Sequence, residues 1–300
     1  METGIDHEKD KIEKAIALAR VERPAYSHLY SFLEALFLAR AEARGFLNIT
    51  VPLLPKHIVG KKWDNGLPLL NRWDFPIDLD AAERLLDTTG TIIPDDSNQL
   101  SAAWNAIRRS LPTEAPERQE FWSSFLQHEM EPWEEWFEIG KEADPGSILF
   151  LARSAVRPSL EFTAGKLIEQ HPVPSSWLKG YCPVCGSLPS LLLLGSEGER
   201  KGFCSWCATT WDLHALQCPY CNNRYHESLG YIGLEAEHFN RIVYCNLCRF
   251  YFKQLDTREL AYPPYLPLEE WTTLHMDLVA GKSGFNQPPS PAPAIYGESE

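Results

Sequence analysis

The sequence contains eight cysteines, and their spacing is the first feature with a clear chemical meaning. They form four Cys-x-x-Cys pairs: Cys182 and Cys185, Cys204 and Cys207, Cys218 and Cys221, and Cys245 and Cys248. Such a pair places two thiolates on one tight turn, where both can reach a single ion at about 2.3 Å. Since a tetrahedral site needs four ligands, two pairs must converge on each ion. The cysteines therefore predict two four-cysteine sites that hold zinc or iron.

The order of the pairs leaves two groupings open. Sequential grouping joins the first pair with the second and the third with the fourth, and we favour it. The 18 and 23 residues between the grouped pairs can each hold a β-hairpin, and residues 195–199, GSEGE, have the composition of a hairpin turn. A cross-braced grouping of alternate pairs, as in RING domains, is the alternative.

Redox-active disulfides are a less favoured interpretation of the same cysteines. The N-terminal residues contain no uninterrupted apolar stretch of signal-peptide length, and the cytosol keeps thiols reduced. The nearby His214, His226 and His238 are interpreted as surface or outer-sphere residues, because the cysteines already complete both ligand sets. Residues 182–186, CPVCG, have the form of a rubredoxin knuckle, and zinc ribbons use the same knuckle, so both metals remain open.

The charge of the chain argues against a nucleic-acid partner. The formal net charge is −13, and residues 182–260 carry seven Lys and Arg against eight Asp and Glu. A module without excess positive charge lacks the electrostatic footprint for DNA or RNA. Motifs of the common hydrolases, nucleotide-binding proteins and metalloproteases are also missing from the sequence, and sites filled by four thiolates offer no position for a reactive water. We therefore expect a protein that is not an enzyme.

The elements before the cysteines are predicted to be helical. Apolar residues recur at helical spacing in five segments, which we place at residues 26–45, 79–90, 100–111, 117–139 and 147–170. Asp78 or Asp80 precedes the second helix, Gly90 is its expected end, and Pro132 is expected to bend or break the fourth. Residues 49–76 are rich in Pro, Gly and Trp and are expected to be irregular.

Beyond residue 180 the pattern changes to short apolar runs separated by turn residues, as in small β-ribbons. The sequence thus predicts an α+β protein with an N-terminal helical bundle followed by two small rubredoxin-like or zinc-ribbon β modules. The expected domains are residues 1–171, 181–215 and 216–262, with a C-terminal segment at 263–300 that ends in a Pro-rich tail. No apolar run approaches the roughly 20 residues that span a bilayer, so we expect a cytoplasmic protein without membrane insertion.

Several segments together resemble one known family. The cysteine pairs lie in the segments YCPVCGSLPS, FCSWCATTW, CPYCN and VYCNLCRFYFK. Two further segments precede them, GLPLLNRWDFPID and LARSAVRPSLE, and one follows them, LHMDLVAGKSGF. In this order they resemble the formate dehydrogenase accessory protein family, FdhE, over roughly residues 10–285. The Pro-rich tail after Phe285 departs from the family pattern.

The resemblance implies a function. Proteins of this family are associated with maturation of respiratory formate dehydrogenases, so the implied partner is the catalytic subunit of that enzyme. The family is linked to rubredoxin-type iron sites, and the eight cysteines correspond to the ligands. A rubredoxin-like electron carrier is the alternative, and a zinc-ribbon nucleic-acid-binding protein is less favoured. Aromatic residues around the linker at 172–180, namely Trp177, Tyr181 and Trp211, are candidate anchors for a partner; packing between domains is the equal alternative for each.

Overall fold

The computed structural model describes residues 2–126, 143–234, 237–260 and 262–289. The chain divides into two compact units that are each discontinuous in sequence. The first comprises Met1–Pro52 and Arg72–Thr163, and the second comprises Leu53–Asn71 and Ala164–Glu300. Residues 53–71 thus belong with the cysteine-bearing part of the chain, which a division near residue 171 does not anticipate. No helix among the described residues is long and apolar enough to cross a membrane.

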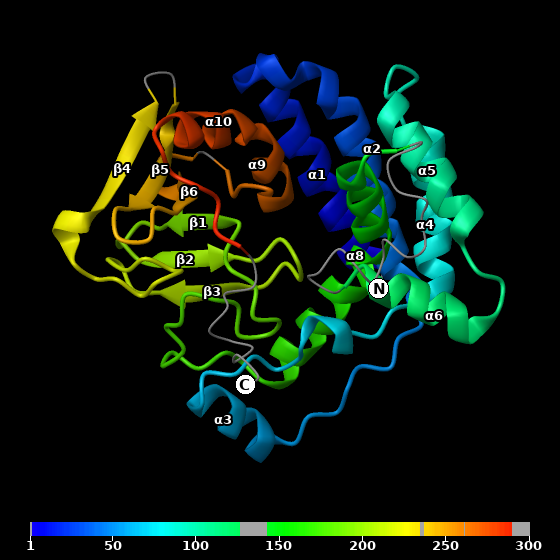
Figure 1. Ribbon diagram of the computed structural model, residues 1–300, viewed down its shortest axis with the longest axis horizontal. Helices are drawn as coiled ribbons and strands as arrows, with labels where there is room; N and C mark the ends of the chain where they lie inside the picture. The colour runs from blue at the N-terminus through cyan, green and yellow to red at the C-terminus, as the bar shows by residue number, and fades with distance from the viewer. Residues whose placement is uncertain (1, 127–142, 235–236, 261, 290–300) are drawn as a thin grey trace. The chain divides into compact units, whose positions relative to one another are not determined.

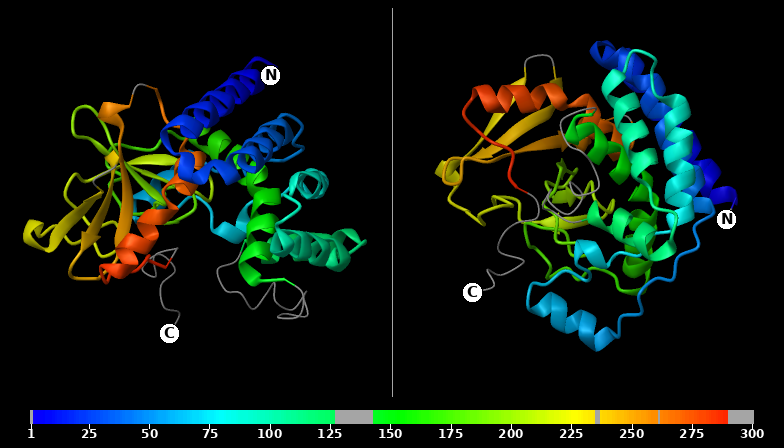
Figure 2. Two further views of the ribbon diagram at one scale, coloured as in Figure 1. Left: turned by 90° about the horizontal axis from the view of Figure 1, so that it is seen from above. Right: turned by 45° about the vertical axis from the view of Figure 1, so that its right-hand side comes forward.

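The first unit is built from helices, which appear in blue to green in Figures 1 and 2. They are α1 (Glu2–Glu22), α2 (Ser27–Gly45), α4 (Leu79–Ile92), α5 (Asn98–Ser110), α6 (Ala115–Ser124) and most of α8 (Pro145–Gln170), with 3₁₀ turns at Pro24–Tyr26 and Arg72–Asp74. Their apolar faces bury aromatic side chains such as Tyr30, Phe37 and Trp122. The predicted helical character of this region is confirmed.

The ends of these helices show which local signals were informative. Asp78 caps α4 by accepting a hydrogen bond from the backbone N–H of Ala81 at 2.9 Å. The helix does not stop at Gly90 but continues to Ile92. Gly90 instead makes room for a neighbour, because a Cβ there would lie 2.4 Å from the indole of Trp104. The glycine therefore serves helix packing rather than helix termination.

Some predictions for the N-terminal helical region differ from the structure, and others concern residues that the structure does not describe. Helix α1 was not assigned from the sequence, because its charged residues obscure the apolar stripe that buries Ile12 and Ile16. Of the helix expected at 117–139, the structure describes α6 and then Phe125 and Leu126. The proposed bend at Pro132 lies outside the described residues, as does most of the Pro-rich tail.

The second unit contains one six-stranded sheet. The strands are β1 (Leu191–Leu194), β2 (Arg200–Phe203), β3 (Thr210–Leu213), β4 (Leu229–Leu234), β5 (Glu237–Cys245) and β6 (Tyr251–Asp256), with 3₁₀ turns at His226–Ser228 and Thr257–Glu259. Their order across the sheet is β3-β2-β1-β6-β5-β4 (Figure 1). All neighbours are antiparallel except β1 and β6, which pair in parallel from Leu191 opposite Lys253 to Leu194 opposite Asp256.

The α+β class and the C-terminal β-structure are therefore confirmed, with one difference. The sequence suggested two separate small modules, whereas the parallel β1–β6 pair joins them into a single sheet. Strand spacing along the chain signals hairpins, but it carries no information about a parallel pair whose members are far apart in sequence.

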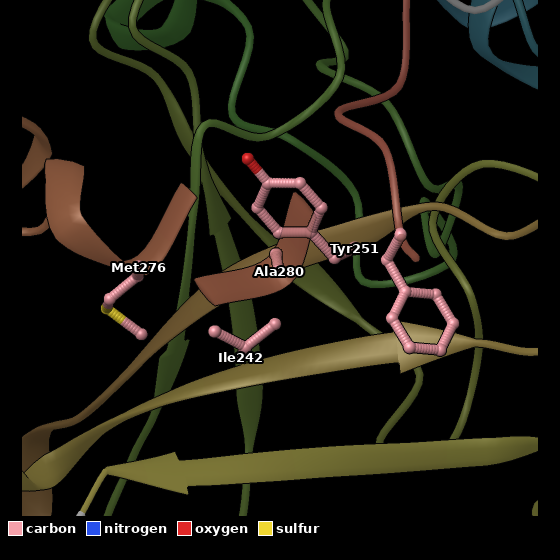
Figure 3. Close-up of a cluster of buried hydrophobic side chains, with 5 residues drawn as sticks. Ile242, Tyr251, Met276 and Ala280 are labelled. Atoms are coloured by element: carbon pink, nitrogen blue, oxygen red, sulfur yellow. The ribbon is translucent and has the colours of Figure 1, made fainter. Parts of the chain in front are cut away.

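Two short helices in the C-terminal segment cover one face of this sheet. They are α9 (Leu266–Thr272) and α10 (Leu274–Lys282), neither of which was assigned from the sequence. Met276 and Ala280 of α10 lie against Ile242 of β5, and Tyr251 of β6 belongs to the same buried cluster (Figure 3). The Tyr251 hydroxyl donates to Asp277 at 2.8 Å. This cluster stabilises the half of the sheet that carries the second group of cysteines.

Candidate metal centre

All four Cys-x-x-Cys pairs adopt the same turn. The first cysteine accepts a hydrogen bond from the backbone N–H four residues later: Gly186 to Cys182 at 3.0 Å, Ala208 to Cys204 at 2.8 Å, Asn222 to Cys218 at 3.0 Å and Arg249 to Cys245 at 2.9 Å. The N–H of that same cysteine donates to the carbonyl five residues later, at 2.8–3.0 Å. Each turn therefore presents its two thiols on one side, as a metal-binding knuckle requires.

The residue after the second cysteine has a left-handed backbone in every knuckle. The φ angle is +74° at Gly186, +58° at Ala208, +58° at Asn222 and +62° at Arg249. Glycine adopts this conformation without cost and asparagine at low cost, whereas alanine and arginine are strained there. The sequence signalled the turn in the first and third knuckles only, because only these have a residue that favours it.

The first and second knuckles bring four buried thiols together. The Sγ atoms of Cys182 and Cys207 are 3.6 Å apart, and those of Cys185 and Cys204 are 3.5 Å apart. Cys207 Sγ also lies 3.6 Å from Cys185 Sγ and 3.7 Å from Cys204 Sγ. All four cysteines are buried.

The third and fourth knuckles form a second group with the same spacing but more exposure. Cys218 and Cys248 have their Sγ atoms 3.7 Å apart, as do Cys221 and Cys245. Cys221 is exposed and Cys248 is half-buried, while the other two are buried. The thiols of each group lie within 4.8 Å of one another. Sequential grouping of the pairs is thus the arrangement found.

These distances fit a tetrahedral ion. Four sulfurs at about 2.3 Å from a central ion would be about 3.8 Å apart along each edge of the tetrahedron. The observed separations of 3.5–3.7 Å are close to that value. Both groups therefore have the donor set and the size for zinc or iron, each of which takes four thiolates in this geometry.

Two hairpins position the knuckles. Strands β1 and β2 pair with Leu191 opposite Phe203, so the chain turns at residues 195–199 and returns Cys204 to the first knuckle. Gly195 N–H donates to the Glu199 carbonyl at 2.9 Å to close this turn, as predicted from its composition. In the second hairpin Leu229 of β4 lies opposite Cys245 of β5, which returns the fourth knuckle to the third.

Polar side chains approach the sulfurs from outside each group. Ser187 Oγ lies 3.0 Å from Cys185 Sγ, and Thr209 Oγ1 lies 3.2 Å from Cys207 Sγ. In the second group Asn223 Nδ2 donates to Cys245 Sγ at 3.4 Å. Such outer partners orient metal ligands and stabilise the charge on thiolates. No sequence signal other than adjacency to a knuckle marks these three residues.

Burial and hydrogen bonds move the thiol pKa values in different directions. Burial raises the pKa of Cys182 and Cys207 well above the ordinary range. Burial also raises the pKa of Cys218 strongly and that of Cys248 to about 11. For Cys245 burial again acts upward, but backbone N–H groups of the knuckle and the Asn223 amide outweigh it and lower the pKa to about 7. Cys245 is therefore more ready to act as a thiolate than Cys182, Cys207, Cys218 or Cys248.

A segment from far upstream in the sequence hydrogen-bonds to the backbone of the first knuckle. Residues 53–71 contain α3 (Lys56–Asp64), and the backbone N–H groups of Leu69 and Leu70 donate to the carbonyls of Pro183 and Val184 at 3.0 and 2.9 Å. The Trp63 indole N–H also donates to the Pro183 carbonyl, at 3.2 Å. This region was expected to be irregular, yet it forms a helix and then hydrogen-bonds the metal-binding turn.

The aromatic residues suggested as partner anchors have other roles. Trp177 and Trp211 are each 3% exposed, and their indole N–H groups donate to the carbonyls of Tyr181 and Lys179 at 3.1 and 3.0 Å. The Tyr181 hydroxyl donates to the Gly66 carbonyl at 2.7 Å. Both tryptophans are therefore packing residues of the second unit, so the exposed-anchor interpretation is wrong for them. Neither His214 nor His226 belongs to a thiol group, and the His238 side chain lies outside the described residues.

Known proteins share both sequence and fold with this chain. No family model matches it. An FdhE homologue from Aquifex aeolicus is 34% identical over 142 residues, which are 45% of this chain and 48% of that protein. An FdhE homologue from Haemophilus influenzae is 32% identical over 111 residues, 35% of each chain. The matches thus span less than half of the length of these curated relatives.

A solved structure extends the similarity to nearly the whole chain. The crystal structure of the FdhE protein from Pseudomonas aeruginosa superposes with a TM-score of 0.65 at 19% identity, covering 95% of this chain and 94% of that one. The chain is similar to FdhE proteins in sequence over part of its length and in fold over nearly all of it. At that level of identity the structural match shows the fold, and the curated relatives show sequence similarity over 35–48% of their length. Two four-cysteine groups that fit metal ions thus occur here in a fold similar to that of an FdhE protein.

Proposed function

We propose that this chain is a cytoplasmic accessory protein of the FdhE type for the maturation of respiratory formate dehydrogenase, and that it acts by binding the catalytic subunit of that enzyme. The similarity to FdhE proteins supports the link to formate dehydrogenase. The observation that carries the mode of action is the closure of both cysteine groups, each with four thiols at tetrahedral spacing. An ion held by four thiolates has no open position for substrate or water.

The eight cysteines are proposed to hold two ions, which keep the knuckles and hairpins in shape. Small β-structures built around thiolate sites gain folding free energy from the metal. In this proposal the ions maintain a surface for a partner rather than perform chemistry. The acidic charge of the chain, −13, agrees with a protein partner rather than a nucleic acid.

The test uses cells that make a respiratory formate dehydrogenase and lack their own FdhE protein. The chain is supplied unchanged, as Cys182→Ser, as Cys245→Ser, or as the double variant. Each single variant should lose about one metal ion per chain, because sequential groups are independent sites. Formate dehydrogenase activity and co-purification of the catalytic subunit should fall in both single variants and in the double variant, while synthesis of that subunit continues.

Ser205→Ala is the matched control, because it alters the second knuckle without removing a thiol. It should retain both ions and full maturation activity. Full formate dehydrogenase activity in the double variant would contradict the proposal, since neither metal group could then be needed. Full maturation by the unchanged chain without co-purification of the catalytic subunit would contradict the proposed mode of action.

A rubredoxin-like electron carrier is the second candidate, and the exposure of Cys221 and Cys248 favours it. Iron held in the second group would lie near the surface, where electron exchange with a partner is fast. This candidate predicts a coloured protein that dithionite bleaches and air restores. A colourless zinc protein that still supports maturation would exclude it.

A further inference from the structure

A cavity of about 270 Å³ opens on the second unit, beside the third knuckle. Side chains of β4, β5 and β6 line it, together with the loop that leads to Cys218. Tyr231, Val243 and Phe252 lie directly opposite one another in register and so share one face of the sheet. The α10 cluster with Ile242 and Tyr251 occupies the alternate positions and hence the other face (Figure 3).

The most unusual residue of the cavity is Arg200. It is only 8% exposed, and its guanidinium donates one hydrogen bond, from Nη1 to the Gln217 carbonyl at 2.7 Å. Its Nε has no hydrogen-bond partner, and no carboxylate pairs with it among the residues that the structure describes. Arginine stays charged in proteins, and a buried charge is costly unless an opposite charge lies close to it. The acidic group whose charge acts on the Arg200 guanidinium is the Cys218 thiol of the third knuckle, and no carboxylate adds to it among the described residues.

A second buried polar group lies on the same wall. Gln254 is 7% exposed, lines the cavity and makes no side-chain hydrogen bond within the described residues. Arg241 lies opposite Gln254 in register, but Asp256 already accepts from its Nη2 at 3.0 Å. Asp256 also pairs with Arg258. The only buried carboxylate of this region is therefore shared by two arginines, and Arg200 is left without one in the described chain.

From this arrangement we propose that the cavity binds a carboxylate ligand, with Arg200 as the charged anchor and Gln254 as an additional hydrogen-bond donor. A guanidinium can hold both oxygens of a carboxylate, and the Gln254 amide can donate to one of them. The remaining wall is apolar and aromatic, with Leu216, Val243 and Phe252, so the ligand carries a small apolar group beside its carboxylate. Cys218 and Cys245 of the second cysteine group also line this cavity, and carboxylate binding there extends beyond the proposed accessory function.

The first experiment titrates sodium benzoate into the full-length protein with its metals, at constant ionic strength, with binding followed by calorimetry and ligand-observed NMR. Benzoate has the carboxylate and apolar ring that the cavity should accept, and benzamide is its neutral analogue. Benzoate should bind saturably and about tenfold or more tightly than benzamide, because a hydrogen bond to a charged group exceeds a neutral one. Equal binding of the two, or no saturable binding of benzoate, would overturn the proposal.

Variants then locate the site. Arg200→Gln should weaken benzoate about tenfold or more and leave benzamide unchanged. Lys201→Gln is the matched control: it removes the same charge from the next residue of β2, whose exposed side chain pairs with Asp212 at 3.8 Å. Parent-like affinity in Arg200→Gln would overturn the assignment.

If Arg200→Gln does not fold, Gln254→Glu tests the same assignment of Arg200 as the charged anchor. The new carboxylate would neutralise Arg200 from within the protein, so benzoate binding should be lost and the thermal midpoint should rise. A fall in the midpoint with benzoate binding retained would contradict the proposal. Acetyl-Gly-Phe and its amide are titrated in parallel. If benzoate binds more tightly than acetyl-Gly-Phe, the better ligand is a small-molecule carboxylate. If acetyl-Gly-Phe binds more tightly, the better ligand is the C-terminal carboxylate of a peptide.

Discussion

At the scale of single residues, the left-handed position in each knuckle distinguishes four otherwise similar turns. Arg249 uses its side chain to offset the strain, since it donates from Nη2 to the Gly284 carbonyl at 3.0 Å and lies over the Phe285 ring at 4.3 Å. Ala208 has no such compensation, because its methyl group cannot hydrogen-bond. The second knuckle therefore carries strain that the first knuckle avoids with Gly186.

Ala208→Gly is expected to stabilise the protein. Relief of a left-handed alanine is worth about 1–2 kcal/mol, whereas the added freedom of glycine in the unfolded chain costs about 0.5–1 kcal/mol. The free energy of unfolding should thus rise by up to about 1.5 kcal/mol, measured by denaturant titration of the metal-loaded chain.

The reverse substitution in the first knuckle is the control for this prediction. Gly186→Ala places a methyl group at φ +74° and should lower the free energy of unfolding. If Ala208→Gly were destabilising while Gly186→Ala were neutral, left-handed strain would not be the feature that separates the knuckles.

At the scale of elements, the upstream segment at residues 53–71 determines how well the first metal group is enclosed. Leu69 is fully buried, and its backbone N–H donates to the Pro183 carbonyl inside the knuckle. Its side chain and its backbone thus support the same turn. No comparable upstream segment hydrogen-bonds to the third knuckle in the described residues, which agrees with the greater exposure of the second group.

Leu69→Ala should therefore weaken metal retention in the first group. The cavity left by a buried leucine costs about 2–5 kcal/mol, and part of that loss should appear as faster metal release. The measurement uses a Cys245→Ser background, in which only the first group remains complete, with release followed by a chromogenic chelator.

Leu67→Ala is the matched control, because Leu67 lies in the same segment but is 44% exposed. It should release metal at the rate of the background protein. Equal release from both variants would show that the segment does not support the first knuckle through its buried side chain.

At the scale of the whole molecule, the two units should respond differently to metal removal. The first 181 residues contain no cysteine, and the helices of the first unit have their own buried core. The sheet of the second unit instead converges on the two cysteine groups. Folding of the helical unit should therefore be independent of metal, and folding around the knuckles should depend on it.

Chelation of the full chain should proceed in two phases while most helical circular dichroism persists. The fast phase is expected to be the second group, because Cys221 is exposed and Cys248 is half-buried, whereas all four thiols of the first group are buried. Cys245→Ser should lack the fast phase. A cooperative loss of helical signal on chelation would contradict the independence of the helical unit.

The sequence by itself determined the features that depend on local spacing. Cys-x-x-Cys pairs identify the candidate ligands because both thiols sit on one turn, and the intervening lengths indicate hairpins that return one pair to another. Helical periodicity identified α2, α4, α5 and α8 for the same reason, since each pattern is contained within one segment.

Only the tertiary structure decided the features that join distant segments. Three such features connect residues that are far apart in sequence. They are the parallel pairing of β1 with β6, the hydrogen bonds from residues 69 and 70 to the first knuckle, and the position of Arg200 and Gln254 on one cavity wall. A single sequence records no signal for such contacts, because hydrogen bonding and burial between distant segments depend on the whole fold. Arg200 and Gln254 read as ordinary strand residues until the sheet encloses them.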